Sequence, residues 1–335
     1  MKKRGKGYAS IYFGMGNTAK PNPSSAHVEL LEDGSALVRC GAADLGQGSD
    51  TALCQIAAET LGLDPVRVTI KSADTLVTPE AGNSSASRQT YVSGNAVRLA
   101  AEQVREIVLA EAADELDASF EELEMRNGYV FHHTMPQRRL AIADVCQTLR
   151  SRGALTLGSG SFSPATPLAL DPETGAGIAY GAYSYATQMV EVEVDTETGE
   201  YEIVNVVAAH DVGRCVNPMA TEGQVEGGVV FGLGYGMMEE ILWDAEGNML
   251  TTGFDTYLLP TSLDTPPVGS LIVEEPEPTG PFGAKGTGEP PACPTAAALV
   301  SAIRDAVGVD ITTLPVTSEK VYVALRALEA AVGAP

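Results

Sequence analysis

Apolar and polar residues alternate in three stretches of this chain, and a dipeptide that favours a tight turn interrupts each of them. Alternation over a few residues is typical of a half-buried β-strand, so each stretch predicts a β-hairpin. The predicted hairpins span residues 26–40, 125–133 and 183–213, with turns at Asp33-Gly34, Asn127-Gly128 and Thr198-Gly199.

Other stretches repeat their apolar residues at helical spacing. We expect one helix that Ser49 or Asp50 can cap at its start and that Gly62 ends. A long helix is predicted over residues 84–116, in which Gly94 costs about 1 kcal/mol relative to alanine. A close packing partner or a ligand at Gly94 would explain that cost. Further helices are predicted over residues 140–150, 217–241 and 295–307, and the second of these is rich in glycine.

The order of these elements indicates the fold class. Strands are interrupted by helices without a regular strand–helix–strand repeat, which favours an α+β fold over a parallel barrel. Residues 153–179 have the composition of a loop and mark the best internal boundary. We therefore expect two mixed α/β subdomains, residues 1–160 and 180–335, joined by a linker over residues 161–179.

Composition and charge narrow the class of protein. The chain has 335 residues, of which 44% are hydrophobic and 19% charged, as in a globular protein of one or two domains. A formal charge of −23 disfavours nucleic acid and anionic membranes as partners. The longest apolar run, residues 229–238, is half of the roughly 20 residues that cross a bilayer, and the N-terminus lacks the apolar segment of a signal peptide. We expect a cytoplasmic protein.

Common catalytic and metal-binding motifs are missing from the sequence. The five cysteines form no Cys-x-x-Cys pair, which argues against an iron–sulfur or structural zinc site in this chain. Residues 280–287 resemble a phosphate loop but lack the Gly-Lys-Ser/Thr order that an ATPase or GTPase needs. There is no Gly-x-Ser-x-Gly or His-Glu-x-x-His pattern. His210-Asp211 at a strand end could form a catalytic pair, although a histidine satisfied by its turn is the more common situation.

Several glycine-rich or polar segments could together hold a ligand. Gly46-Gln47-Gly48 precedes a helix, where free backbone N–H groups attract an anion such as a phosphate. The serine-rich start of the long helix and Gln224 before Glu226 fit the same pattern, although each alone also fits an ordinary helix cap. Lys285 and Glu289 lie in a third loop, GPFGAKGTGEPP, framed by glycine and proline. The set fits a large polar ligand held by backbone and amide groups.

Four of these stretches carry a family resemblance. They are DLGQGSDTALCQIAAETLG, SSASRQTYVSGNAV, HDVGRCVNPMATEGQVEGGVVFGLG and GPFGAKGTGEPP. In this order they resemble the C-terminal part of the molybdopterin-binding subunit in the xanthine dehydrogenase family of molybdenum hydroxylases. The resemblance extends over nearly the whole chain.

The resemblance implies a cofactor and the residues that bind it. The cofactor would be molybdenum with molybdopterin cytosine dinucleotide, whose dithiolene sulfurs hold the metal without side-chain ligands. A terminal sulfido or selenido ligand would complete the coordination of the metal. Glu289 matches the family's catalytic glutamate and would accept the proton of the attacking water-derived hydroxyl. We expect it to be enclosed with little water, although a glutamate that caps the following helix is the alternative. The implied cofactor-binding residues are Gly46, Gln47, Gly48, Thr51, Ser84, Ser85, Ala86, Ser87, Arg88, Gln89, Gln224 and Lys285.

The resemblance also implies partner chains. The chain lacks the family's earlier half, with its GGFGGK-like segment and an arginine-bearing loop near the substrate, and so resembles one half of a split subunit. Such subunits are similar to the medium molybdopterin subunit of nicotinate dehydrogenase. Its partners would be a large molybdopterin subunit, an iron–sulfur subunit with 2Fe–2S clusters and an FAD subunit. The expected reaction hydroxylates an N-heteroaromatic ring, with nicotinate favoured and xanthine or another purine close behind. A non-catalytic scaffold subunit is the competing function.

Overall fold

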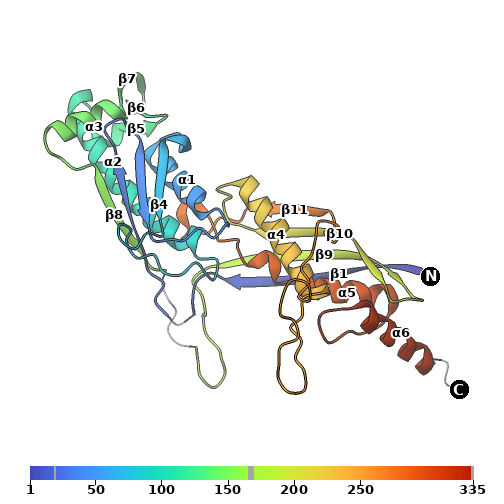
Figure 1. Ribbon diagram of the computed structural model, residues 1–335. Coiled ribbons are helices and arrows are strands. Elements are labelled where there is room, and N and C mark those ends of the chain that lie inside the picture. The colour runs from blue at the N-terminus through green and yellow to red at the C-terminus, as the bar shows by residue number, and fades with distance from the viewer. Residues whose placement is uncertain (19, 165–169, 333–335) are drawn as a thin grey trace.

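The chain folds into two lobes that lie side by side (Figure 1). The computed structural model describes residues 1–18, 20–164 and 170–332. Within them, each lobe consists of helices packed on a four-stranded β-sheet, and the first lobe carries a further three-stranded sheet. The α+β class expected from the sequence is confirmed.

The first lobe has the sheet order β4-β3-β2-β8. Its hairpin, β2 to β3, is the one predicted around Asp33-Gly34, and Gly34 has the positive φ of 76° that such a turn requires. The crossover helix α1 connects β3 to the parallel strand β4. The bounds are β2 Ser24–Leu30, β3 Ala36–Cys40, α1 Ser49–Leu61, β4 Val68–Ser72, α2 Gly94–Leu116 and β8 Leu157–Phe162, with a 3₁₀ turn η1 at Pro65–Arg67.

A small antiparallel sheet extends the first lobe at the far end of α2. The predicted hairpin at Asn127-Gly128 is confirmed as β5 and β6, and the predicted helix after residue 140 is confirmed as α3. The bounds are η3 Phe120–Glu122, β5 Leu123–Arg126, β6 Tyr129–His132, β7 Met135–Ala141 and α3 Ile142–Ser151.

The second lobe has the sheet order β1-β9-β10-β11. The predicted hairpin around Thr198-Gly199 is confirmed as β9 and β10, and β11 runs parallel to β10. Helices α4 and α5 cover one face of this sheet (Figure 1). The bounds are β1 Lys2–Gly14, β9 Tyr183–Asp195, β10 Tyr201–Asp211, α4 Pro218–Met237, β11 Val268–Val273, η4 Pro281–Gly283, η5 Pro290–Ala292, α5 Thr295–Val307 and α6 Ser318–Val332. No helix in the described ranges combines the length and apolar character needed to cross a membrane.

Two strands differ from the sequence-based expectation, and glycine explains the first of them. β8 lies inside residues 153–179, which were expected to be a loop. A Cβ at Gly158 or Gly160 would lie 2.1 Å from a backbone oxygen of α2, so only glycine lets this strand pack on the helix. Because glycine occupies the inward positions, the strand shows no apolar alternation. The same stretch contains residues 165–169, which lie outside the described residues.

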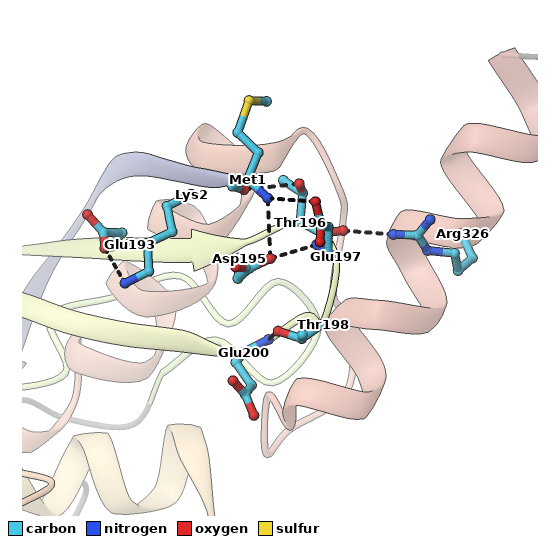
Figure 2. Close-up of polar contacts among 9 residues, drawn as sticks. All are labelled: Met1, Lys2, Glu193, Asp195, Thr196, Glu197, Thr198, Glu200 and Arg326. Carbon is cyan, nitrogen blue, oxygen red and sulfur yellow. Dashed lines mark hydrogen bonds and ion pairs between the residues drawn. The ribbon is translucent and has the colours of Figure 1, made fainter.

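The first strand belongs to the second lobe. β1 pairs antiparallel with β9 along its length, so Lys2–Gly14 leaves the first predicted subdomain and joins the sheet of the second. A Cβ at Gly5 or Gly7 would lie 2.3 or 2.1 Å from a backbone oxygen of α5, which explains these glycines. The start of this strand lies beside the β9–β10 turn (Figure 2), where the Met1 amino group contacts Asp195 and Glu197 at 3.4 and 3.5 Å.

The long helix begins later than the pattern predicts. Residues 84–88 form a loop, Gln89–Ser93 form a π-helical turn, and α2 starts at Gly94. The predicted close partner of Gly94 is present, because a Cβ there would lie 2.8 Å from Ile56 and 2.9 Å from Pro281 of the second lobe. Gly94 therefore lets α2 pack closely on α1 of its own lobe and on Pro281 of the second lobe.

Candidate functional site

A cavity of about 450 Å³ lies where the two lobes meet. Its walls come from the start of α1, the loop before α2, the start of α4 and the loop before α5. Most of the residues expected to bind a ligand line it, namely Gln47, Gly48, Ser84, Ser85, Ser87, Arg88, Gln89, Gln224, Lys285 and Glu289. Gly46, Thr51 and Ala86 are not among the lining residues.

Glu289 connects the two lobes at the edge of this cavity. Its Oε1 accepts a hydrogen bond from the Ala86 N–H at 2.8 Å, and its Oε2 accepts one from the Ser87 hydroxyl at 2.6 Å. The Glu289 N–H donates to the same Ser87 Oγ at 3.0 Å. The carboxylate is therefore directed to the other lobe, and it makes no hydrogen bond as a cap of the turn that follows it. Glu289 is exposed, so the enclosed, dry setting expected from the sequence is wrong for this chain, because the cavity opens to solvent there.

The loop that holds Glu289 has an uncommon backbone. Ala86 and Ser87 both have positive φ, 53° and 49°, a conformation that costs free energy in residues with a Cβ. The three hydrogen bonds to Glu289 offset that cost. Gly286 allows the contact, because a Cβ there would lie 1.6 Å from the Ser87 carbonyl oxygen.

Glycines of α4 position the Glu289 loop from the other side. A Cβ at Gly228 would lie 2.4 Å from the Pro291 Cβ, and one at Gly232 would lie 2.6 Å from both the Ala292 oxygen and Thr295. The glycine-rich character of this helix thus lets its backbone contact η5 and the start of α5 directly. This packing fixes the segment on which Glu289 lies.

The backbone N–H groups before α1 are not free for an anion. The Asp44 carboxylate accepts hydrogen bonds from the N–H groups of Gly46, Gly48 and Asp50 at 2.9, 3.2 and 3.0 Å. Although burial opposes the effect, these bonds lower the pKa of Asp44. The helix starts after Gly48, whose φ is 81°, and not after a capping Ser49 or Asp50. The expected phosphate contact at this helix start is therefore wrong for these N–H groups.

The two positively charged side chains of the predicted set already interact with other groups of the protein. Arg88 is buried, and its Nη1 and Nη2 atoms donate to backbone carbonyl oxygens of Asn22, Pro23, Ala81 and Asn83. Lys285 is buried beside Asp211, with 2.6 Å between Nζ and Oδ2. Both residues line the cavity while their charged groups stabilise the loops around it.

The neutral polar residues fall into two groups. Gln47, Ser84 and Gln89 use their side chains in hydrogen bonds within the protein. The side chains of Ser85 and Gln224 make no hydrogen bond within the described residues, although both line the cavity. These two are therefore the predicted residues best able to contact a bound molecule.

Arg214 was not singled out from the sequence, yet it lines the cavity. It is exposed and forms no ion pair with any described residue, so its charge is available to an anion. Its position inside a resembling stretch, HDVGRCVNP, was a signal that could have identified it. Cys215, Asn217 and Thr221 from the same stretch also line the cavity.

His210 is a buried structural group. It is fully buried, and its Nε2 lies 3.2 Å from Nε2 of Gln188. Burial lowers the pKa of His210 to about 4, which keeps the ring neutral at pH 7. Asp211 pairs with Lys285 instead of His210, so the two neighbours form no catalytic pair. In the described part of the chain, no cluster of three or more His, Cys, Asp or Glu side chains is suited to hold a metal ion.

Comparison with known proteins decides the family. Residues 1–266 match the family model of the molybdopterin cofactor-binding domain. The chain belongs to the molybdopterin-binding subunits of the xanthine dehydrogenase family of molybdenum hydroxylases. It is 33% identical over 306 residues to the gamma subunit of the 6-hydroxypseudooxynicotine dehydrogenase complex of Paenarthrobacter nicotinovorans, a match that covers 88% of this chain and 36% of that one. A putative xanthine dehydrogenase molybdenum-binding subunit of Escherichia coli K12 is also 33% identical, over 96% of this chain and 42% of its own length.

A solved structure has the same fold. Quinoline 2-oxidoreductase from Pseudomonas putida 86 superimposes with a TM-score of 0.87 at 28% identity, over 97% of this chain and 42% of that one. The molybdopterin-binding chain described here therefore spans about two fifths of the length of such relatives. Its cavity fits the family's cofactor in character, because the free hydroxyl of Ser85, the free amide of Gln224 and the unpaired Arg214 line it.

Proposed function

We propose that this chain is the molybdopterin-binding subunit of a multi-subunit molybdenum hydroxylase that hydroxylates an N-heteroaromatic substrate with oxygen from water. Nicotinate is the favoured substrate, and xanthine or another purine is the alternative. The observation that carries the proposal is the position of Glu289 at the edge of an inter-lobe cavity, oriented by Ala86 and Ser87.

Several residues are suited to hold the cofactor, proposed as the cytosine dinucleotide form. Gln224 and Ser85 have free side chains in the cavity wall, and Arg214 offers an unpaired guanidinium to a phosphate. Gln47 and Gln89 shape the walls while their amides bond to neighbouring protein groups. Gly288 lines the cavity beside Glu289. A Cβ there would have Ser87 Oγ at 3.6 Å as its nearest atom, so a side chain at this position would take up space in the cavity.

In the proposed reaction, Glu289 is the group that accepts a proton. When bound, the cofactor supplies a molybdenum centre that takes two electrons from the substrate and activates a water-derived oxygen. One Glu289 carboxylate oxygen would accept a proton there, while Ala86 and Ser87 hold the carboxylate in place.

Exposed apolar side chains support the proposal of partner subunits. The outer side of α4 exposes Met219, Phe231 and Tyr235, and the segment between α4 and β11 adds Trp243 and Phe254. Aromatic residues and methionine are enriched in protein interfaces. A large molybdopterin subunit is the proposed partner at this face. Iron–sulfur and FAD subunits, and a cytoplasmic location, belong to the same proposal.

The relatives favour catalysis over a scaffold function. Their names include a 6-hydroxypseudooxynicotine dehydrogenase, a putative xanthine dehydrogenase, a quinoline oxidoreductase and an aldehyde oxidoreductase, all of which are redox enzymes. The scaffold alternative requires the fold without the reaction. Against it, Glu289 keeps a hydrogen-bonded position at the cavity, which a scaffold does not need.

One experiment separates these functions. The chain is co-expressed with the products of its neighbouring genes, and the purified complex is analysed for molybdenum and for cytidine phosphate released by acid. Turnover of nicotinate and of xanthine is then measured in water labelled with oxygen-18. We expect molybdenum, a cytidine phosphate and labelled hydroxylated product. A folded complex that contains neither metal nor nucleotide would support the scaffold and end the proposal.

A further inference from the structure

Gln188 occupies a core position of β9 where an apolar side chain is expected. Val190, Val192 and Val194 are the buried residues at alternate positions farther along the strand. Gln188 continues this row and has 0% exposure. A buried amide costs free energy unless protein groups replace its hydrogen bonds to water. The partners of the Gln188 side chain therefore indicate why the residue is there.

Those partners belong to the segment that follows Glu289. Gln188 Nε2 donates to the Pro291 carbonyl oxygen at 2.7 Å, and its Oε1 accepts from the Thr295 hydroxyl at 2.6 Å. Thr295 is the first residue of α5, is also fully buried, and lies with its Oγ1 3.2 Å from the same Pro291 carbonyl. One amide from the central sheet thus holds both ends of the connection between η5 and α5.

Chemistry fixes the orientation of this amide. The Pro291 carbonyl can only accept, so the NH₂ group of Gln188 must face it. The same NH₂ group lies 3.2 Å from His210 Nε2, which therefore accepts and leaves the proton of the neutral ring on Nδ1. His210 Nδ1 has no partner within the described residues. A flipped amide would place its oxygen against the Pro291 oxygen, so the network has a single favourable arrangement.

The Glu289 segment has few other polar groups by which the protein can hold it. Pro290 and Pro291 have no N–H to donate. The Glu289 N–H bonds to Ser87 of the first lobe, and the Pro291 carbonyl bonds to Gln188 of the second. The backbone that carries Glu289 is therefore held from two sides, once beside the cavity and once from within the core.

We propose that Gln188 is a positioning residue. Its buried amide fixes the backbone of residues 289–291 and thereby the place of the Glu289 carboxylate relative to Ser87 and the cavity. The consequence for turnover rests on the proposed function, whereas the consequence for the loop does not.

Hydrogen exchange of the full chain tests the effect on the loop. Gln188→Met removes the amide while keeping an unbranched side chain of similar length, and Val192→Ala is the matched control because it weakens the same buried row away from the loop. We expect the amides of Glu289, Ala292 and Cys293 to exchange about tenfold faster in Gln188→Met than in the control. Thr295→Val should give a smaller increase, because the Gln188–Pro291 bond stays. If these exchange rates increase no more in Gln188→Met than in Val192→Ala, the proposal is overturned. If Gln188→Met does not fold, the exchange rates of Thr295→Val are compared with those of Val192→Ala by the same criterion.

Kinetics of the assembled enzyme test the effect on the reaction. For Gln188→Met we expect kcat per bound molybdenum to fall about tenfold while KM and molybdenum content stay at the wild-type values. A merely structural residue would lower the yield of complex and leave kcat per molybdenum unchanged, which would overturn the positioning role. If the wild-type complex turns over no N-heteroaromatic compound, the proposed function fails and the exchange experiment alone decides the role of Gln188.

Discussion

The Ser87 hydroxyl donates to Glu289 Oε2 at 2.6 Å and accepts from the Glu289 N–H at 3.0 Å. One hydroxyl thus contacts both the carboxylate and the backbone of a residue 202 positions away in the sequence. It belongs to the first lobe and Glu289 to the second, so this contact sets the position of the candidate base and also joins the lobes at the cavity.

Ser87→Ala removes both of these hydrogen bonds. Because a hydrogen bond contributes about 1 kcal/mol net, and Glu289 is exposed, we expect a loss of roughly 1 kcal/mol in the free energy of unfolding. Urea unfolding followed by circular dichroism measures it. Ser161→Ala, which removes an exposed serine–serine contact in β8, serves as the control and should have almost no effect. Equal stability of the two variants would contradict the importance assigned to the Ser87 contact.

Two adjacent glycines of α4 should respond to alanine in opposite ways. In Gly228→Ala the new Cβ would lie 2.4 Å from Pro291, so the Glu289 loop must move at a cost of about 1–3 kcal/mol. In Gly227→Ala the Cβ meets nothing within 4 Å, and the higher helix propensity of alanine should stabilise the chain by up to about 1 kcal/mol. Thermal unfolding of both variants tests this pair. The packing argument fails if Gly228→Ala is as stable as Gly227→Ala.

His210 should make the chain sensitive to acid. Burial lowers its pKa from 6.5 to about 4, so the neutral ring is favoured in the folded state. The stability it contributes is complete above pH 6.5 and is lost as the pH falls toward 4. A pKa difference of this size corresponds to about 3 kcal/mol. In His210→Gln, urea midpoints measured between these pH values should fall less steeply than in the wild type, and an unchanged slope would contradict the assignment.

The free polar groups of the cavity should determine cofactor retention. Arg214→Gln removes the unpaired cation, and Gln224→Ala removes a free amide, so each should lower the molybdenum and nucleotide content of the purified complex severalfold. Arg150→Gln on α3, which breaks only an exposed ion pair with Glu32, is the control. Full cofactor content in both cavity variants would show that these residues do not bind it.

The sequence predicts which segments form helices and strands better than it predicts which of these segments pair and pack together. The three hairpins and α5 follow directly from apolar spacing and turn residues, and their bounds agree with the structure. β8 was missed because Gly158 and Gly160 replace the apolar residues that would have marked its buried face. The lobe to which β1 belongs depends on pairing with a strand that lies much later in the chain, which no local pattern contains.

For the candidate site, too, the sequence reveals some features and not others. The residues that line the cavity lie within the four family-like stretches, although fewer than half of them were named from the sequence. Their hydrogen bonds could not be predicted. That Asp44 occupies the N–H groups before α1, and that carbonyl oxygens occupy Arg88, depends on how loops fold back on themselves. The role of Gln188 was hidden because a single polar residue in a strand pattern does not reveal what it bonds to.

Glu289→Gln in the assembled complex tests the central claim most directly. The amide keeps the size of the side chain. Its oxygen can accept from the Ala86 N–H while its NH₂ group donates to Ser87 Oγ, but it cannot take up a proton at neutral pH. We predict that molybdenum content and complex assembly stay at the wild-type values while kcat falls by several orders of magnitude. A Glu289→Gln complex that retains full turnover would contradict the assignment of Glu289 as the base.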